Sequence, residues 1–220
     1  MQLALTVAYG RMTLNEALER MARGDKVGQL MTLHGISRAL ATQIALGQAS
    51  LEQVLLKRRF AQHREENRDH SGLVDALQHG KPVMLSLHGG ERVQGVVTAV
   101  EPYTLTLRED DGTPKELHKL QLQYFYGADD WKLVRKGIKK DKAVAALAIV
   151  PAERPQDRYT CSDKRLFRYL DAHMTVQATL IDGQVLKGEP TWFSRYEIGL
   201  HVGGASLVVF RHALHDLTEV

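Results

Sequence analysis

The sequence predicts an α+β fold, in which an N-terminal helical region is followed by two related β units, each preceded by a short helix. A pattern of nine apolar, glycine and tyrosine positions occurs twice in the 220 residues, at a constant offset of 93. Helix-starting signals and helical apolar spacing come before both copies. A duplicated pattern constrains the architecture because each copy encodes the same unit. The paired positions are Val83 and Val176, Leu85 and Ala178, Leu87 and Leu180, Gly90 and Gly183, Val93 and Leu186, Gly95 and Gly188, Tyr103 and Tyr196, Leu105 and Ile198, and Leu107 and Leu200.

Each copy predicts five short strands joined by tight turns. Apolar residues recur every second position at the start of each copy, which is the period of a half-buried strand. The dipeptides Gly89-Gly90 and Asp182-Gly183 then favour hairpin turns. Gly95 and Gly188 lie inside the second strands, where glycine marks a bend or a close approach of another backbone. Five short, bent strands with tight turns indicate a small, curved barrel in each copy.

The pattern divides the chain into four parts. A short helix from Ser71 to Leu77 opens the first barrel and ends at Gly80, and a helix from Ser162 to Leu170 opens the second. The predicted parts are a helical module at 1–66, a first barrel at 71–126, a basic linker at 127–161 and a second barrel at 162–220.

The N-terminal module begins with a capping box, Thr13-Leu14-Asn15-Glu16, and predicts four helices. The second helix is expected at 27–33, the third after Ser37 and the fourth at 50–59. Residues 30–38 resemble a helix-turn-helix unit, which would leave an exposed face for base contact. That face carries Arg38, Thr42 and Gln43. An ordinary helical bundle that packs or contacts another protein is the alternative.

Short motifs in both copies resemble the bacterial RNA chaperone Hfq. The run Phe210-Arg211-His212-Ala213 resembles the Tyr-Lys-His-Ala signature of that family, and residues 180–188 are similar to its first strand and turn. Residues 87–95 occupy the matching place in the first copy. The resemblance implies two Sm-like barrels, single-stranded RNA as ligand, and self-association through barrel edge strands.

The resemblance also implies which residues hold RNA. Tyr196 aligns with the aromatic residue on which bases stack, and Arg211 and His212 align with the basic pair of the pocket. Tyr103 and Lys119 are the matching residues of the first copy, in which Leu120 replaces the histidine. The alternatives are that the tyrosines fill the barrel cores and that Arg211 is a surface charge.

Positive charge is concentrated outside the two barrels. The net charge is +3, but residues 127–165 alone hold 10 Lys and Arg against 6 Asp and Glu. Lys136, Lys139 and Lys140 are therefore candidates for contact with RNA phosphates. A solvated helix face is the alternative explanation of this run.

No catalytic or metal-binding pattern stands out, so we expect neither an enzyme nor a cofactor or metal. The sequence has no phosphate-binding glycine loop, and its ten histidines lack the spacing of metal ligands. Cys161 is the only cysteine, which excludes an intrachain disulfide and fits the reducing cytoplasm. The longest apolar run, 143–150, is too short to span a bilayer, and no signal peptide is evident.

The predicted function is binding of single-stranded RNA in post-transcriptional regulation, in the cytoplasm. A DNA-binding regulator is the first alternative, with the N-terminal helices on duplex DNA and the barrels serving only to oligomerise. An interaction scaffold that binds no nucleic acid is the second.

Overall fold

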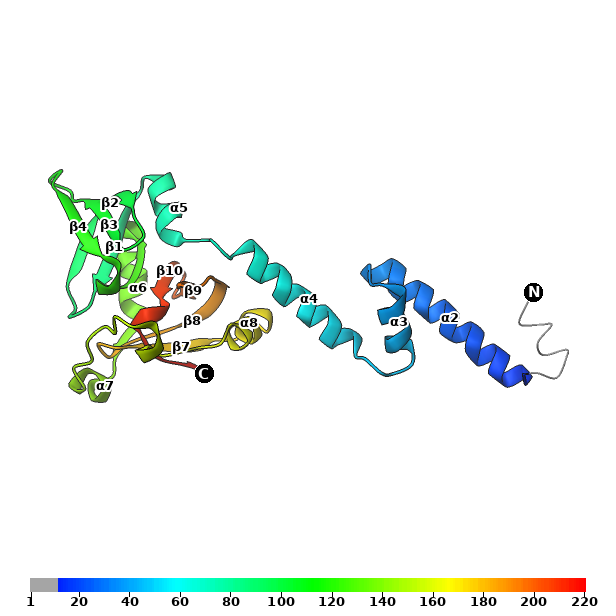
Figure 1. Ribbon diagram of the computed structural model, residues 1–220. Helices are drawn as coiled ribbons and strands as arrows, with labels where there is room; N and C mark the ends of the chain where they lie inside the picture. Colours follow the sequence, from blue (N-terminus) through cyan, green and yellow to red (C-terminus); the bar gives the residue numbers. More distant parts are fainter. Residues whose placement is uncertain (1–11) are drawn as a thin grey trace. The chain divides into compact units, whose positions relative to one another are not determined.

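The computed structural model describes residues 12–220 and divides into two compact units, Met1–Gln62 and His63–Val220 (Figure 1). Residues 1–11 of the predicted helical module lie outside the described residues. The helix α4 begins in the first unit and ends in the second.

The first unit is helical, as predicted. Its helices are α2 (Leu14–His34), α3 (Arg38–Ala45) and the first part of α4 (Leu51–Glu66). The capping box forms at Thr13, whose hydroxyl oxygen accepts from the Glu16 N–H at 3.2 Å. The prediction of a separate helix at 27–33 is wrong, because α2 runs unbroken through this segment. An interior glycine costs a helix only about 1 kcal/mol, and no proline interrupts the run.

A tight turn joins α2 and α3, and the core of the first unit lies between these helices. Gly35 adopts a left-handed φ of 57° there, a conformation that suits glycine. Ala41 is completely buried against Leu30, Ile36 and Ile44. The small alanine therefore lets α3 pack closely on α2.

The second unit carries two series of one helix and five strands. The first series is α5 (Gly72–His79), β1 (Pro82–Leu87), β2 (Arg92–Val100), β3 (Thr104–Arg108), β4 (Pro114–His118), the 3-10 turn η1 (Lys119–Gln121) and β5 (Leu122–Gly127). The second series is α8 (Asp163–Asp171), β7 (Val176–Leu180), β8 (Gln184–Phe193), β9 (Glu197–Val202), β10 (Ala205–Phe210), the 3-10 turn η4 (Arg211–Ala213) and β11 (Leu214–Glu219). The segment between the series contains η2 (Ala128–Asp130), α6 (Trp131–Gly137), β6 (Ile138–Lys140), α7 (Lys142–Ala146) and η3 (Pro155–Asp157).

The strands form one antiparallel sheet, and the prediction of two separate five-stranded barrels is wrong. The strand order is β11-β7-β8-β9-β10-β5-β1-β2-β3-β4, with β6 added beside β8, which makes 11 strands in all. The two series meet where β10 pairs with β5, with Leu207 opposite Tyr126 and Val208 opposite Phe125. An unpaired edge strand exposes backbone donors and acceptors. The pairing of β10 with β5 satisfies these groups on both strands.

The two series also share a hydrophobic core. Phe210 and Ala213 of the second series are buried among the apolar residues of the first, around Leu85 and Leu105. The rings of Phe125 and Phe210 lie 6.0 Å apart across the β5–β10 junction. The core therefore crosses the junction, which separate barrels would not allow.

The local turn predictions are confirmed. Gly90 and Gly183 both adopt positive φ, of 87° and 84°, as the hairpin turns require. A Cβ atom at Gly95 would meet the carbonyl oxygen of Arg108, and one at Gly188 would meet that of His201. Glycine in the second strands thus permits a close backbone approach.

The basic segment between the two series is partly built into the sheet. Its strand β6 pairs with β8, with Lys139 opposite Val185 and Lys140 opposite Gln184. Asp141 follows and caps α7 by accepting from the Ala143 N–H at 2.8 Å. The segment is therefore held in place beside the second series.

Candidate nucleic-acid interface

Two exposed tyrosines occupy equivalent turns of the two series. Tyr103 lies between β2 and β3 and is 75% exposed, and Tyr196 lies between β8 and β9 and is 61% exposed. The guanidinium carbon of Arg195 lies 5.3 Å from the centre of the Tyr196 ring. Neither ring fills a core, so both present flat apolar surface to solvent.

Backbone hydrogen bonds tie each tyrosine to the turn that carries the predicted basic residue. The Lys119 N–H donates to the carbonyl of Tyr103, and the Arg211 N–H donates to that of Tyr196, both at 2.8 Å. The turn η1 precedes β5 and η4 follows β10, and these strands run antiparallel. The predicted residues of both copies therefore gather at one end of the β5–β10 junction.

The Arg211 side chain is engaged inside the protein. Its guanidinium donates to the Asp163 carboxylate at 3.0 Å, to the Ser194 carbonyl at 3.0 Å and to the Cys161 carbonyl at 2.5 Å. Only 20% of the side chain is exposed. These bonds fasten α8 and the β8–β9 turn to η4, which leaves the guanidinium few donors for a phosphate.

The His212 side chain is likewise part of the junction. Its Nε2 lies 2.8 Å from the carbonyl oxygen of Leu122 in β5, to which a neutral ring donates. Burial, together with the positive charge of Arg158, lowers the pKa of His212 to about 4. The ring is therefore uncharged at neutral pH and links the second series to the first.

A buried carboxylate beside Tyr196 was not foreseen from the sequence. Glu197 is 4% exposed, and it accepts from the Ser71 hydroxyl at 2.9 Å and from the Gly72 N–H at 2.6 Å. Burial raises the pKa of Glu197. Burial also lowers the pKa of the partly exposed Lys119, against the opposing charge of Glu197. The sequence signal was slight: an acid stands where the first copy has Thr104.

The basic segment lies at the opposite end of β5, because α6 follows the last residue of that strand after the short turn η2. Lys136, Lys139 and Lys140 are all exposed. The ring of Trp131 carries two guanidinium groups, Arg92 at 4.4 Å and Arg135 at 5.7 Å. This arrangement was missed, although a tryptophan at the start of a basic run is a signal for it.

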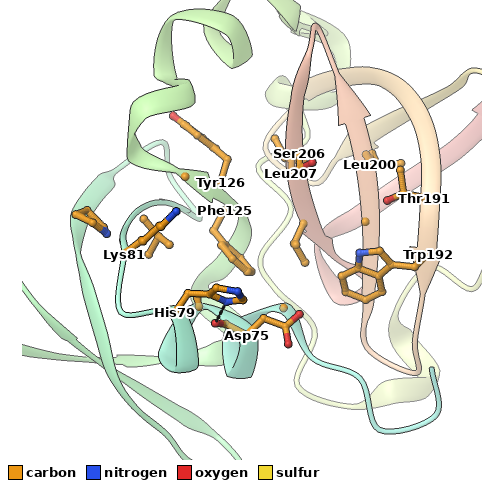
Figure 2. A pocket seen from close by; sticks show the side chains of 17 residues that line it. Asp75, His79, Lys81, Phe125, Tyr126, Thr191, Trp192, Leu200, Ser206 and Leu207 are labelled. Carbon is orange, nitrogen blue, oxygen red and sulfur yellow. Dashed lines mark hydrogen bonds between the residues drawn. The ribbon is translucent and has the colours of Figure 1, made fainter. Parts of the chain in front are cut away.

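A cleft of about 430 Å³ crosses the junction, between α5 and strands β8, β9 and β10 (Figure 2). Trp192 lines one side and packs on Gly199, where a Cβ atom would enter the indole ring. His79 and Asp75 of α5 line the other side, and the His79 ring lies 2.6 Å from the Asp75 carbonyl oxygen. Most of the remaining lining comes from apolar side chains such as Phe125.

The predicted DNA-binding residues lie in the first unit, whereas the residues described above belong to the second. Arg38, Thr42 and Gln43 are all exposed on α3. The Thr42 hydroxyl donates to the Arg38 carbonyl at 2.8 Å, so it is turned toward its own helix. The side chains of Arg38 and Gln43 remain available to solvent.

Residues 12–220 contain neither a membrane-spanning helix nor a metal-binding cluster. No helix there is both long and apolar enough to cross a bilayer. No group of three or more His, Cys, Asp or Glu residues there could hold a metal ion. A comparison of the sequence with protein-family models and with curated proteins finds no match.

Proposed function

We propose that the protein binds single-stranded RNA in the cytoplasm, with bases stacked on Tyr103 and Tyr196, and acts in post-transcriptional regulation. One observation carries the proposal: two equivalent turns each hold a tyrosine ring in solvent, at 75% and 61% exposure. Unpaired bases bind proteins by stacking on such rings, at about 1–3 kcal/mol per base. The resemblance of residues 180–188 and 210–213 to Hfq supports the same function.

Positive charge near these rings and at the far end of β5 is available for the phosphates. Arg195 is exposed above Tyr196, and Lys136, Lys139 and Lys140 are exposed along α6 and β6. Arg211 and His212 have a different role in this proposal, because their polar groups bind other parts of the protein. Arg211 holds the turn that carries Tyr196, through the Ser194 carbonyl, and His212 links η4 to β5.

Fluorescence anisotropy with a labelled U-rich oligonucleotide, at a stated salt concentration, tests the proposal. Replacing both rings, as Tyr103→Leu with Tyr196→Leu, is expected to weaken binding by about 10-fold or more, since each lost stack costs about 1–3 kcal/mol. The matched variant, Tyr103→Phe with Tyr196→Phe, keeps both rings and is expected to bind within a few-fold of the unmodified protein. Equal affinity of the leucine variant and the unmodified protein would remove these turns from the proposal.

Binding of duplex DNA by the first unit is the second candidate function. The left-handed Gly35 turn and the exposed Arg38 and Gln43 are the observations that favour it. Competition between unlabelled duplex DNA and the RNA oligonucleotide separates the two functions. A DNA affinity that falls on Arg38→Ala with Gln43→Ala, while RNA affinity is unchanged, would support this second function.

A further inference from the structure

Side chains occupy the outer edge of β11, the strand at one end of the sheet. The Leu217 N–H donates to the Tyr159 hydroxyl at 3.2 Å, and the Leu217 carbonyl accepts from Arg165 at 2.5 Å. Arg165 also donates to the Tyr159 hydroxyl at 3.3 Å and to the buried Tyr169 hydroxyl at 2.6 Å. These contacts use the backbone groups that a neighbouring strand would otherwise take. We name Tyr159, Arg165 and Tyr169 the edge seal.

The edge seal covers the edge of β11 that corresponds to the edge of β5 on which β10 pairs. β11 is the counterpart of β5, at an offset of 92 residues, so Leu217 corresponds to Phe125. Phe125 lies opposite Val208 of β10, in the pairing that joins the two series. The side chains of Tyr159 and Arg165 thus take the place at β11 that β10 takes at β5.

The two short helices differ at the positions that make the seal. At the offset of 93 that aligns the buried Leu73 with the buried Leu166, Arg165 corresponds to Gly72 and Tyr169 to Ala76. A Cβ atom at Gly72 would lie 2.9 Å from Val208 and 3.1 Å from Phe125, so a side chain there would obstruct β10. Small residues therefore stand where a strand docks, and large polar residues where none does.

We propose that the edge seal prevents β11 from pairing with β4 of a second copy of this chain. β4 lies at the other end of the sheet and is the counterpart of β10, which makes it the strand that would repeat the internal junction. Val208 corresponds to Glu116 at the offset of 92, so the excluded pairing sets Glu116 of one copy opposite Leu217 of the next. The seal thereby stops head-to-tail extension of the sheet. This inference does not depend on RNA binding.

Opening the seal tests the proposal. The variant Tyr159→Phe with Arg165→Ala removes the hydroxyl and the guanidinium that bind Leu217. Size-exclusion chromatography with light scattering is expected to give the mass of one chain for the unmodified protein at micromolar concentration. The opened variant is expected to form multimers whose mass rises with concentration, and Glu116→Pro in β4 is expected to return it to one chain by removing an edge N–H. Circular dichroism and thermal melting confirm that each variant is folded.

Arg168→Ala is the matched control, since it removes an exposed arginine of the same helix whose partner is the Glu219 carboxylate, at 2.8 Å. It is expected to remain one chain. An opened variant that is folded and stays one chain at every concentration would overturn the proposal. So would an unmodified protein that assembles and loses assembly on Glu116→Pro.

Hydrogen exchange gives a readout that does not require the double variant to fold. The Leu217 amide is expected to be protected in the unmodified protein and to lose most of that protection in Tyr159→Phe, while the Ala178 amide is unchanged. Rapid exchange at Leu217 in the folded, unmodified protein would show that the seal is not formed, and would overturn the proposal.

Discussion

At the scale of single residues, the pair that resembles an RNA pocket is used to hold the protein together. Arg211 binds Asp163 and two carbonyl groups, and His212 binds the carbonyl of Leu122. Both side chains are largely shielded, and the polar groups that they satisfy belong to distant parts of the second unit. The presence of Arg211 and His212 in the sequence is therefore accounted for by these internal hydrogen bonds, without any contact with RNA.

His212 makes the stability of the second unit depend on pH. Its pKa is lowered to about 4, so acid favours the unfolded state, in which the ring takes up a proton near pH 6.5. The stabilisation by His212 is complete above pH 6.5 and decreases as the pH falls toward 4, by up to about 3 kcal/mol. His212→Gln keeps an N–H donor and does not titrate. Urea unfolding at pH 7 and pH 4 is expected to show a smaller acid loss in His212→Gln, and equal losses would contradict this.

Glu197 fastens the start of α5 to the second series. Glu197→Ala removes the acceptor for the buried Gly72 N–H and is expected to reduce the free energy of unfolding by about 1–3 kcal/mol. Glu197→Gln retains an acceptor oxygen without the charge and is expected to lose less. Denaturant unfolding of both variants checks this, and an alanine variant at least as stable as the glutamine variant would refute the assignment.

At the scale of secondary-structure elements, the close contact of α5 with β10 depends on a glycine. Gly72→Ala is expected to cost about 1–3 kcal/mol, because the added methyl would press on Val208 and Phe125. Gly28→Ala in α2 is the control: nothing lies within 4 Å of its added methyl, and alanine favours a helix by about 1 kcal/mol. Chemical denaturation of each variant measures the change, and a neutral Gly72→Ala would show that α5 is free to move.

The element α6–β6 gives a prediction for the salt dependence of RNA binding. The triple variant replaces Lys136, Lys139 and Lys140 by Gln and is expected to weaken RNA binding. It should also reduce the slope of log affinity against log salt by up to about 2, because each phosphate contact on a single strand contributes roughly 0.7. Lys26→Gln with Lys57→Gln in the first unit is the control, for which the slope stays unchanged. Anisotropy titrations at several salt concentrations measure it; an unaltered slope in the triple variant would exclude this segment from the interface.

At the scale of the whole molecule, one sheet and one shared core predict that the two series unfold together. Phe210 and Ala213 sit in the core of the first series, so that core is incomplete without the second series. Calorimetry is expected to show one cooperative transition for residues 63–220, with Gly72→Ala shifting that transition as a whole. Hydrogen exchange in β1 and β7 during unfolding checks the same point. Separate transitions for the two series would contradict the shared core.

Features that depend on neighbouring residues could be predicted from the sequence: the capping box at Thr13, the hairpin glycines, and the order of one short helix and five strands in each copy. The sequence did not predict which strand of one copy pairs with which strand of the other. Both copies have the same kind of edge strands, and one edge strand can pair with several different ones. The partners of Arg211, His212 and Glu197 are set by the tertiary structure. Arg211 bonds Cys161, 50 residues away, and His212 bonds Leu122, 90 residues away. Glu197 bonds Ser71, 126 residues away. Such contacts form only once the chain is folded, so periodicity and spacing carry no record of them.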